Sequence, residues 1–259
     1  MKRLRVLMTR QEVTPERLAG ATAVVIDVFM ATTTLLTILE NGARNVYPVA
    51  GLEEADRVKA TLDAEGVLRG GEQDAARIEG YDHGPFPEEY PPEVVNEKDV
   101  IFVTTNGTRA IADAAPADTV LLGTLRNATA VARYLEESGT DSIYFICAGS
   151  AGRFTGEDFL GAATILSEMD VDGWRLNDGA WLALDFAGRH TEDVSGTLER
   201  SRAGRWFVEN DRMDVFDFVA EVGASEVVPE VFEGKLRFAG GPEDGSSAKI
   251  HDAGQGGTS

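Results

Sequence analysis

Acidic and hydroxyl side chains that could do chemistry follow an apolar run early in this 259-residue sequence. Asp27 comes directly after residues 23–26, and Thr32, Thr33 and Thr34 lie in the turn that follows. An acid at the end of a buried strand costs free energy unless it binds a cation or caps a turn. The start of the next helix offers free N–H groups that suit a phosphate or carboxylate. Asp27 is therefore a candidate metal ligand or nucleophile, with helix capping as the structural alternative.

Further polar residues follow the apolar runs 99–103 and 142–147, and others lie in the long segment 66–96. They are Glu72, Glu79 and Asp82 in segment 66–96, Thr104, Thr105 and Asn106 after run 99–103, and Arg153, Glu157 and Asp158 after run 142–147. Carboxylates suit a hard cation such as Mg²⁺, whereas arginine, threonine and N–H groups suit a phosphate. Together they predict a site that stabilises a transferring phosphoryl group. The local alternatives are a capping box at Thr155 and Asp158 and a simple turn at Asn106-Gly107.

Several other chemistries are excluded by missing motifs. The sequence has no Walker A motif, no Gly-x-Gly-x-x-Gly after a strand and no Gly-x-Ser-x-Gly elbow. The three histidines, His83, His190 and His251, are scattered, which argues against a zinc cluster. The single cysteine, Cys147, excludes an internal disulfide and lies in an apolar run, where core packing is expected.

The elements that must position these residues alternate between strands and helices. Apolar runs predict strands at 4–8, 23–26, 46–49, 99–103, 120–122 and 142–147, with two short strands at 226–232 and 235–238. Three of the runs lead through a polar turn into a helix, which predicts parallel pairing with helices on both faces of a sheet. We expect an α/β protein with a mixed, largely parallel sheet. Segment 66–96 is expected to be one long, ordered loop.

The domain organisation follows from the distribution of apolar residues. Residues 1–239 are expected to form a single domain, with a division into two subdomains as the alternative. Residues 240–259 carry almost no apolar side chains and predict a disordered tail.

Charge limits the partners that this protein can have. Its 44 acidic and 24 basic residues give a formal net charge of −20, which argues against binding nucleic acid or an anionic membrane. Arginine outnumbers lysine by 19 to 5. An excess of acidic residues with little lysine predicts a protein adapted to concentrated salt, and the alternative is an ordinary acidic protein. No apolar stretch approaches the roughly 20 residues of a membrane span, and no signal-peptide pattern is present, so a cytoplasmic protein is expected.

Four blocks of sequence, at residues 26–34, 78–84, 104–109 and 147–160, resemble the 2-phosphosulfolactate phosphatase family in order and spacing. They read Ile26-Asp27-Val28 with Ala31-Thr32-Thr33-Thr34, Ile78-Glu79-Gly80-Tyr81-Asp82, Thr104-Thr105-Asn106-Gly107-Thr108-Arg109, and Cys147-Ala148-Gly149 with Gly152-Arg153-Phe154 and Glu157-Asp158-Phe159-Leu160. The resemblance spans about residues 4–238. It implies a three-layer α/β/α fold and Mg²⁺-dependent hydrolysis of a phosphate monoester on a sulfonated hydroxy acid, converting 2-phosphosulfolactate to sulfolactate and phosphate.

The resemblance also implies roles for individual residues. The catalytic residues would be Asp27, Arg153 and Asn106. The substrate would be bound by Thr32, Thr33, Thr34, Thr105 and Arg109. The Mg²⁺ ligands would come from Asp27, Glu72, Glu79, Asp82, Glu157 and Asp158. The expected partner is a small phosphate monoester, and the oligomeric state stays open, with a homo-oligomer as one option.

Three departures from the family pattern bear on the substrate. Met30 stands where the family usually has arginine, Gln73 replaces the arginine of Glu-Arg-Gly-Gly, and Gly84-Pro85-Phe86-Pro87 replaces Gly-Asn-Ser-Pro. The loss of two arginines predicts a pocket with less positive charge, because each charged hydrogen bond contributes about 1.5–3 kcal/mol. The alternatives are an enzyme for another phosphorylated acid, a non-catalytic binder of a small anionic metabolite, and restoration of the charge by Arg69 or Arg77.

Overall fold

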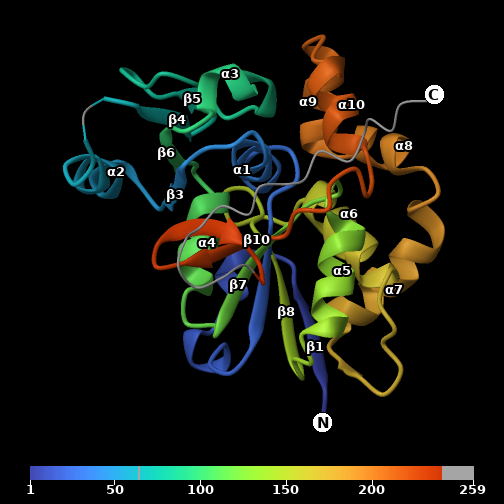
Figure 1. Cartoon of the computed structure of the whole chain (residues 1–259). Helices are drawn as coiled ribbons and strands as arrows, with labels where there is room; N and C mark the ends of the chain where they lie inside the picture. The colour runs from blue at the N-terminus through green and yellow to red at the C-terminus, as the bar shows by residue number, and fades with distance from the viewer. Residues whose placement is uncertain (64, 241–259) are drawn as a thin grey trace, which may run out of the picture.

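The computed structural model describes residues 1–63 and 65–240, and its strands form two sheets (Figure 1). Across the larger sheet the order is β11 (Lys235–Phe238), β10 (Pro229–Phe232), β7 (Thr119–Gly123), β2 (Thr22–Ile26), β8 (Ser142–Cys147), β1 (Arg3–Leu7) and β9 (Arg175–Leu176). In this order, β7, β2, β8, β1 and β9 are parallel to one another, and β10 runs antiparallel to both of its neighbours, β7 and β11. The carboxyl ends of β2 and β8 therefore meet at one edge of the sheet.

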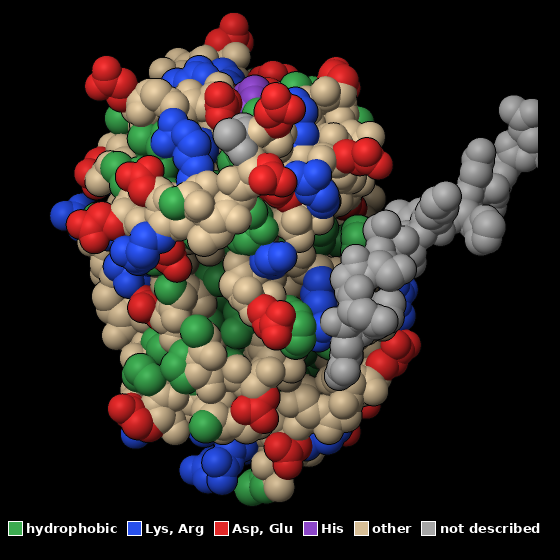
Figure 2. All heavy atoms as spheres, turned by 60° about the vertical axis from the view of Figure 1, so that its left-hand side comes forward, with side chains coloured by type: hydrophobic (Ala, Val, Ile, Leu, Met, Phe, Trp, Pro, Cys, Tyr) green, Lys and Arg blue, Asp and Glu red, His purple; other side chains and the backbone are tan. Residues whose placement is uncertain are grey.

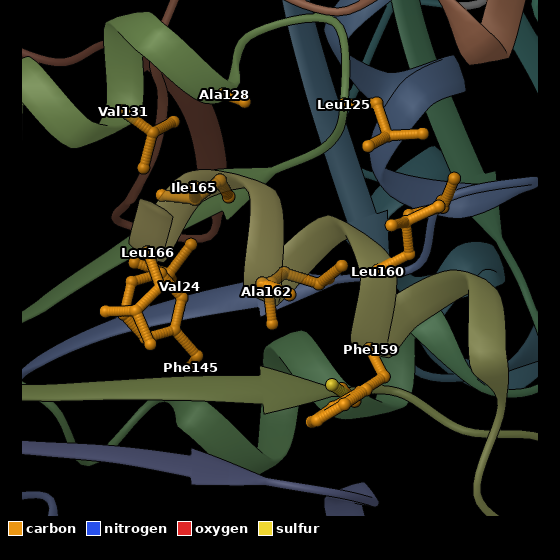
Figure 3. Packing of buried hydrophobic residues seen from close by; sticks show 14 of the residues in the cluster. Val24, Leu125, Ala128, Val131, Phe145, Phe159, Leu160, Ala162, Ile165 and Leu166 are labelled. Carbon is orange, nitrogen blue, oxygen red and sulfur yellow. The ribbon is translucent and has the colours of Figure 1, made fainter. Parts of the chain in front are cut away.

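Both faces of the larger sheet are covered by helices, and alternate residues of each central strand face opposite sides of the sheet. One face packs against α5 (Ala128–Glu137), α6 (Gly156–Ser167) and α7 (Asp178–His190), and the other against α1 (Ala31–Glu40) and α4 (Gly107–Ala114). In β2, Val24 and Ile26 pack with the first group of helices, whereas Ala23 and Val25 pack with the second. Figure 3 shows Val24 and Phe145 beside Leu166 of α6. The predicted three-layer α/β/α fold is confirmed.

The smaller sheet lies beyond α1 and α4 and has its own core. Its order is β3 (Asn45–Val49), β6 (Asp99–Val103), β4 (Val67–Gln73) and β5 (Ala76–Arg77), with α2 (Leu52–Lys59) packed against it. Val46, Val100 and Phe102 face α1 and α4, whereas Tyr47 and Ile101 pack with the α2 side. The mixed, largely parallel arrangement that we predicted thus divides between two sheets.

Segment 66–96 contains regular structure, so the prediction of one long loop is wrong. Besides β4 and β5 it holds a 3₁₀ turn, Pro87–Glu89, and the short helix α3, Pro92–Val95. The glycines that suggested a loop instead allow close packing within a strand. A Cβ on Gly70 would lie 1.8 Å from the Tyr90 hydroxyl, and one on Gly71 would lie 1.8 Å from the Val103 carbonyl oxygen.

Three helices after α7 cover the carboxyl end of β2. They are α8 (Val194–Glu199), α9 (Arg202–Glu209) and α10 (Met213–Ala220). The Phe29 ring lies 4.6 Å from the Phe207 ring of α9 and 5.7 Å from the Phe216 ring of α10, measured between centroids. This aromatic cluster fixes α9 beside the turn that begins with Asp27.

Two further expectations concern the surface and the end of the chain. Acidic and basic side chains are interspersed over the face drawn in Figure 2. No helix among the described residues is long and apolar enough to cross a membrane. The predicted tail, apart from Gly240, lies outside the described residues, and the single-domain organisation stays a prediction.

Candidate active site

The turn after β2 is held by the threonines at the beginning of α1. The Thr32 hydroxyl accepts the Asp27 N–H at 3.0 Å and donates to the Asp27 carbonyl oxygen at 2.8 Å. The Thr33 hydroxyl donates to the Val28 carbonyl at 2.6 Å, and the Thr34 hydroxyl donates to the Pro85 carbonyl at 2.7 Å. All three side chains are buried. Their hydroxyl hydrogens are used within the protein, so these threonines shape the turn and offer no free donor to a ligand.

Asp27 itself lies against the beginning of α4. A Cβ on Gly107 would be 2.4 Å from the Asp27 Oδ2 atom and 2.3 Å from the Ala31 Cβ atom, so glycine is required for this contact. Burial raises the pKa of Asp27 well above its ordinary value, and the charges of Asp158, Glu72 and Glu157 raise it further. Four carboxylates from three segments thus converge near the end of β2.

Asp158, in the first turn of α6, joins the ends of two neighbouring strands. Its Oδ1 atom accepts the Val28 N–H at 3.0 Å, and its Oδ2 atom accepts the Gly149 N–H at 2.9 Å and the Thr155 hydroxyl at 2.7 Å. Burial raises its pKa to about 7, with the Glu157 charge adding to the shift. Thr155 makes no side-chain cap, so the capping box that we considered does not form. Asp158 instead ties the segments after β2 and β8 to α6.

The neighbouring Glu157 has an oxygen with no partner. Its side chain is buried, and Oε2 has no hydrogen-bond partner among the described residues. Burial raises the pKa of Glu157, although a Ser201 hydrogen bond and the charges of Arg202 and Arg205 oppose this. A buried acceptor without a partner is costly, and a bound cation would satisfy it.

Glu72 braces the hairpin between β4 and β5. Its carboxylate accepts the Thr105 N–H at 2.6 Å, the Thr105 hydroxyl at 2.9 Å and the Ala75 N–H at 2.7 Å. The Thr105 hydroxyl in turn accepts the Asp74 N–H at 2.7 Å. Asp74 and Ala75 have φ angles of 54° and 63°, a conformation that costs non-glycine residues about 1–2 kcal/mol each. Glu72 and Thr105 therefore hold a strained tip in place.

A cleft of about 1080 Å³ opens beside this tip, with the hairpin and the 84–89 segment on one side and α9 on the other. In Figure 1 these elements lie at the same end of the molecule, on either side of α1. Its lining includes the apolar side chains Met30, Phe86, Trp206 and Phe207, the arginines Arg77, Arg202, Arg205 and Arg212, the acidic residues Glu72, Asp74, Glu88, Glu89 and Glu209, and the polar residues Thr105, Asn106 and Ser150. The cleft can therefore hold a small molecule with both acidic and apolar parts.

The structure brings together some of the predicted site residues around the cleft. Glu72, Thr105 and Asn106 line it, and Asp27 lies behind Gly107, next to Asn106. Glu157 and Asp158 interact electrostatically with Asp27 from the start of α6. These residues come from β2, β4, β6 and the turn after β8, as expected for strand ends that meet.

Other predicted residues lie outside the cleft lining. Glu79 and Asp82 are exposed, and the Asp82 carboxylate accepts the Arg69 N–H at 2.8 Å. Arg109 donates to the Ala50 carbonyl at 3.4 Å, and Arg153 is exposed in a turn closed by backbone bonds to Ser150. None of these four side chains contributes to the cleft lining.

Of the two positions where the family arginine is missing, one faces the cleft, and the substituted segment Gly84-Pro85-Phe86 also lines it. Met30 contributes to its lining, whereas Gln73 does not. Arg77, one of the two arginines considered as a replacement, does line it, and its Nη2 atom donates to the Asp82 carbonyl at 2.6 Å. Arg69, the other, stacks over the Tyr81 ring at 4.7 Å.

Sequence reasoning missed the contribution of α9. Arg202, Arg205 and Trp206 all line the cleft from this helix. Arg202 and Arg205 are three residues apart, so they share one helix face, and this spacing is the only local signal that could have drawn attention to them.

The carboxylate oxygens near the end of β2 fit a magnesium ion that binds only one or two protein side chains. Among the described residues, no group of three or more histidine, cysteine, aspartate or glutamate side chains is arranged to hold a metal. Mg²⁺ usually takes one or two carboxylates and completes its coordination with water and substrate phosphate. Asp27 and the free Oε2 of Glu157 meet that requirement, whereas the oxygens of Asp158 and Glu72 are already hydrogen-bonded.

Comparison with known proteins adds independent information. The sequence profile described as 2-phosphosulpholactate phosphatase matches residues 7–234. A Symbiobacterium thermophilum protein is 37% identical over 223 residues, covering 85% of this chain and 95% of its own length. A Clostridium acetobutylicum protein is 31% identical over 232 residues, covering 89% and 97%. A Caldanaerobacter subterraneus protein is 44% identical over 146 residues, covering 56% and 60%. Each relative is described as a probable 2-phosphosulfolactate phosphatase.

Proposed function

Because the chain belongs to the 2-phosphosulpholactate phosphatase family, we propose that it is a Mg²⁺-dependent phosphoric monoester hydrolase. Its substrate would be a small phosphorylated hydroxy acid such as 2-phosphosulfolactate, which water cleaves to sulfolactate and phosphate. The observation that carries the proposal is the buried Glu157 oxygen without a partner, in a group of carboxylates that includes Asp27. Buried like charges at a strand end are unfavourable unless a cation offsets them.

Asp27 and Glu157 would hold the ion, and Mg²⁺, when bound, neutralises charge on the phosphoryl oxygens. The phosphate would lie in the cleft beside Asn106, which lines it. The Asn106 Oδ1 atom accepts the Ala151 N–H at 3.4 Å, which directs its amide hydrogens elsewhere and leaves them free to donate to a phosphoryl oxygen. If Asp27 is instead the nucleophile, its carboxylate would attack the phosphorus, the substrate P–O bond would break, and the hydroxy acid would leave after taking up a proton. Water would then hydrolyse the aspartyl phosphate to phosphate and free Asp27, and hydroxylamine would trap this intermediate.

A second candidate, a relative with a different phosphate monoester as substrate, is favoured by the position of Met30. This flexible side chain lies in the cleft wall together with Phe86 and Phe207. It would pack against carbon and cannot pair with an anion. The enzyme would then turn over a phosphorylated acid with an apolar substituent faster than 2-phosphosulfolactate.

The experiment is a screen of phosphate monoesters, with phosphate release measured in Mg²⁺ and in EDTA. We expect release from 2-phosphosulfolactate in Mg²⁺ and its loss in EDTA. Faster turnover of an apolar phosphorylated acid would support the second candidate. Failure to release phosphate from any compound in Mg²⁺ would contradict both.

A further inference from the structure

We infer that Arg202 and Arg205 of α9 form a subsite for the acidic groups of the substrate other than its phosphate, a carboxylate and a sulfonate. This inference rests on the proposed function, because it places those acids across the cleft while the phosphate lies near Asp27. Each acid presents planar or tripodal oxygens that a guanidinium can bind through two N–H groups.

Contacts of α9 with the rest of the protein hold both arginines at the cleft. The Ser201 hydroxyl accepts the Gly204 N–H at 2.9 Å and caps α9, and Phe207 packs on Phe29. These contacts fix the first turn of α9, so both arginines line the cleft. The Arg202 Nη2 atom donates to the Ser150 hydroxyl at 2.5 Å, which holds its guanidinium beside the segment after β8.

Among the described residues, Arg202 and Arg205 lack carboxylate partners in a protein rich in acidic residues. This chain has 44 acidic residues and 24 basic ones, so carboxylate partners are in excess. Of the four cleft arginines, Arg212 pairs with Glu88 and Arg77 donates to a backbone carbonyl. Within the described part of the chain, Arg202 and Arg205 form no ion pair with a carboxylate. The Arg205 Nη1 atom donates to the Arg200 carbonyl oxygen, and both arginines interact electrostatically with Glu157, but no carboxylate of the described residues contacts either guanidinium directly. The remaining N–H groups of both side chains can therefore donate to a ligand.

The charges of the two arginines match those of the substrate's acidic groups. A phosphate monoester carries about −1.5 to −2 near neutral pH, which one Mg²⁺ offsets. 2-Phosphosulfolactate has a carboxylate and a sulfonate besides, and these two negative charges equal the two arginine charges. The positive charge that Met30 does not supply thus comes from α9, a helix about 170 residues further along the chain.

The test compares three substrates in the Arg202→Gln, Arg205→Gln double variant. The substrates are 2-phosphosulfolactate, 2-phospholactate, which lacks the sulfonate, and isopropyl phosphate, which lacks both acids. The matched control is the Arg17→Gln, Arg200→Gln double variant, which removes the same charge from exposed residues outside the cleft. We expect the KM for 2-phosphosulfolactate to rise at least tenfold in the cleft variant, with a smaller rise for 2-phospholactate and no change for isopropyl phosphate. The control should behave as wild type.

Direct binding of sulfolactate, measured by calorimetry, separates this inference from the proposed function. Sulfolactate should bind wild type and the control but bind the cleft variant at least tenfold more weakly. If all proteins release phosphate while the cleft variant matches the control for every substrate and for sulfolactate binding, the subsite is wrong and the phosphatase stands. If no protein releases phosphate while sulfolactate binding still depends on the two arginines, the subsite stands and the proposed reaction is wrong. An equal rise in KM for all three substrates would also overturn the subsite.

Discussion

Replacing Gly107 with alanine should damage the active site more than the fold. The added Cβ would lie 2.4 Å from the Asp27 Oδ2 atom and 2.3 Å from the Ala31 Cβ atom, whereas ordinary contacts begin at 3.4 Å. The Asp27 carboxylate must therefore move by about 1 Å, because 3.4 minus 2.4 is 1.0. A displacement of this size costs about 100-fold in rate when the displaced group is catalytic.

The cost in stability should be small by comparison. Overpacking costs about 1–3 kcal/mol, and the better helix propensity of alanine returns up to about 1 kcal/mol. We expect Gly107→Ala to lower the free energy of unfolding by about 1–2 kcal/mol and kcat/KM for phosphate release by about 100-fold. The control is Gly188→Ala, since Gly188 lies in α7 with no atom within 4 Å of an added Cβ. Wild-type kcat/KM in Gly107→Ala, with the control also unaffected, would refute the placement of Asp27 in the site.

Three other predictions concern stability. Burial alone would raise the pKa of Asp99, but hydrogen bonds from Arg44 and Asn45 outweigh burial, so the pKa is lowered in the folded protein. The Asp99 carboxylate therefore stabilises the fold at pH values above its unfolded pKa, and this contribution is lost as the pH falls through its folded pKa. Arg44→Gln should therefore lower the urea midpoint at pH 7 and change it much less near pH 2, and an equal change at both would contradict this. Ala75→Gly should raise the free energy of unfolding by up to about 1 kcal/mol in urea titrations by relieving a φ of 63°, and a loss of stability would argue against that strain. The formal charge of −20 makes the folded protein repel itself, and 1 M KCl, where the Debye length is about 3 Å, screens this repulsion. The unfolding temperature should therefore be higher in 1 M KCl than in dilute buffer, and equal temperatures would contradict adaptation to salt.

The strands and the meeting of their ends could be predicted from sequence because the signal is local. Runs such as 23–26 and 142–147 are apolar on both faces, which is typical of central parallel strands. Adjacent parallel strands present their carboxyl ends together, so the convergence of Asp27, Glu157 and Asp158 follows from the pattern.

The path of segment 66–96 could not be predicted, because tertiary contacts decide it. The β4–β5 hairpin turns through Asp74-Ala75 instead of the Asn-Gly or Asp-Gly pair that usually marks such a turn. The turn is held by Glu72 and Thr105, residues that no local rule connects. Glu79 and Asp82, which the family resemblance implies as Mg²⁺ ligands, follow this hairpin and lie outside the cleft lining.

The arginines of α9 were missed for a related reason. Nothing near Arg202 and Arg205 in the sequence connects them with the strand ends. Their position depends on Phe29 packing against Phe207, a contact between residues 178 positions apart by the numbering. Such a pairing of aromatic side chains is visible only once the chain is folded.

The central claim, that Asp27 serves a Mg²⁺-dependent phosphatase, is tested most directly by phosphate release from 2-phosphosulfolactate by wild type and Asp27→Asn. Asparagine is nearly isosteric with aspartate but lacks the charge that a hard cation or a covalent mechanism requires. The matched control is Asp172→Asn, an exposed residue between α6 and β9. We predict Mg²⁺-dependent release by wild type and the control, and loss of release by Asp27→Asn with the fold retained, as judged by its circular dichroism spectrum and cooperative unfolding. Undiminished release by Asp27→Asn, or by wild type in EDTA, would contradict the account.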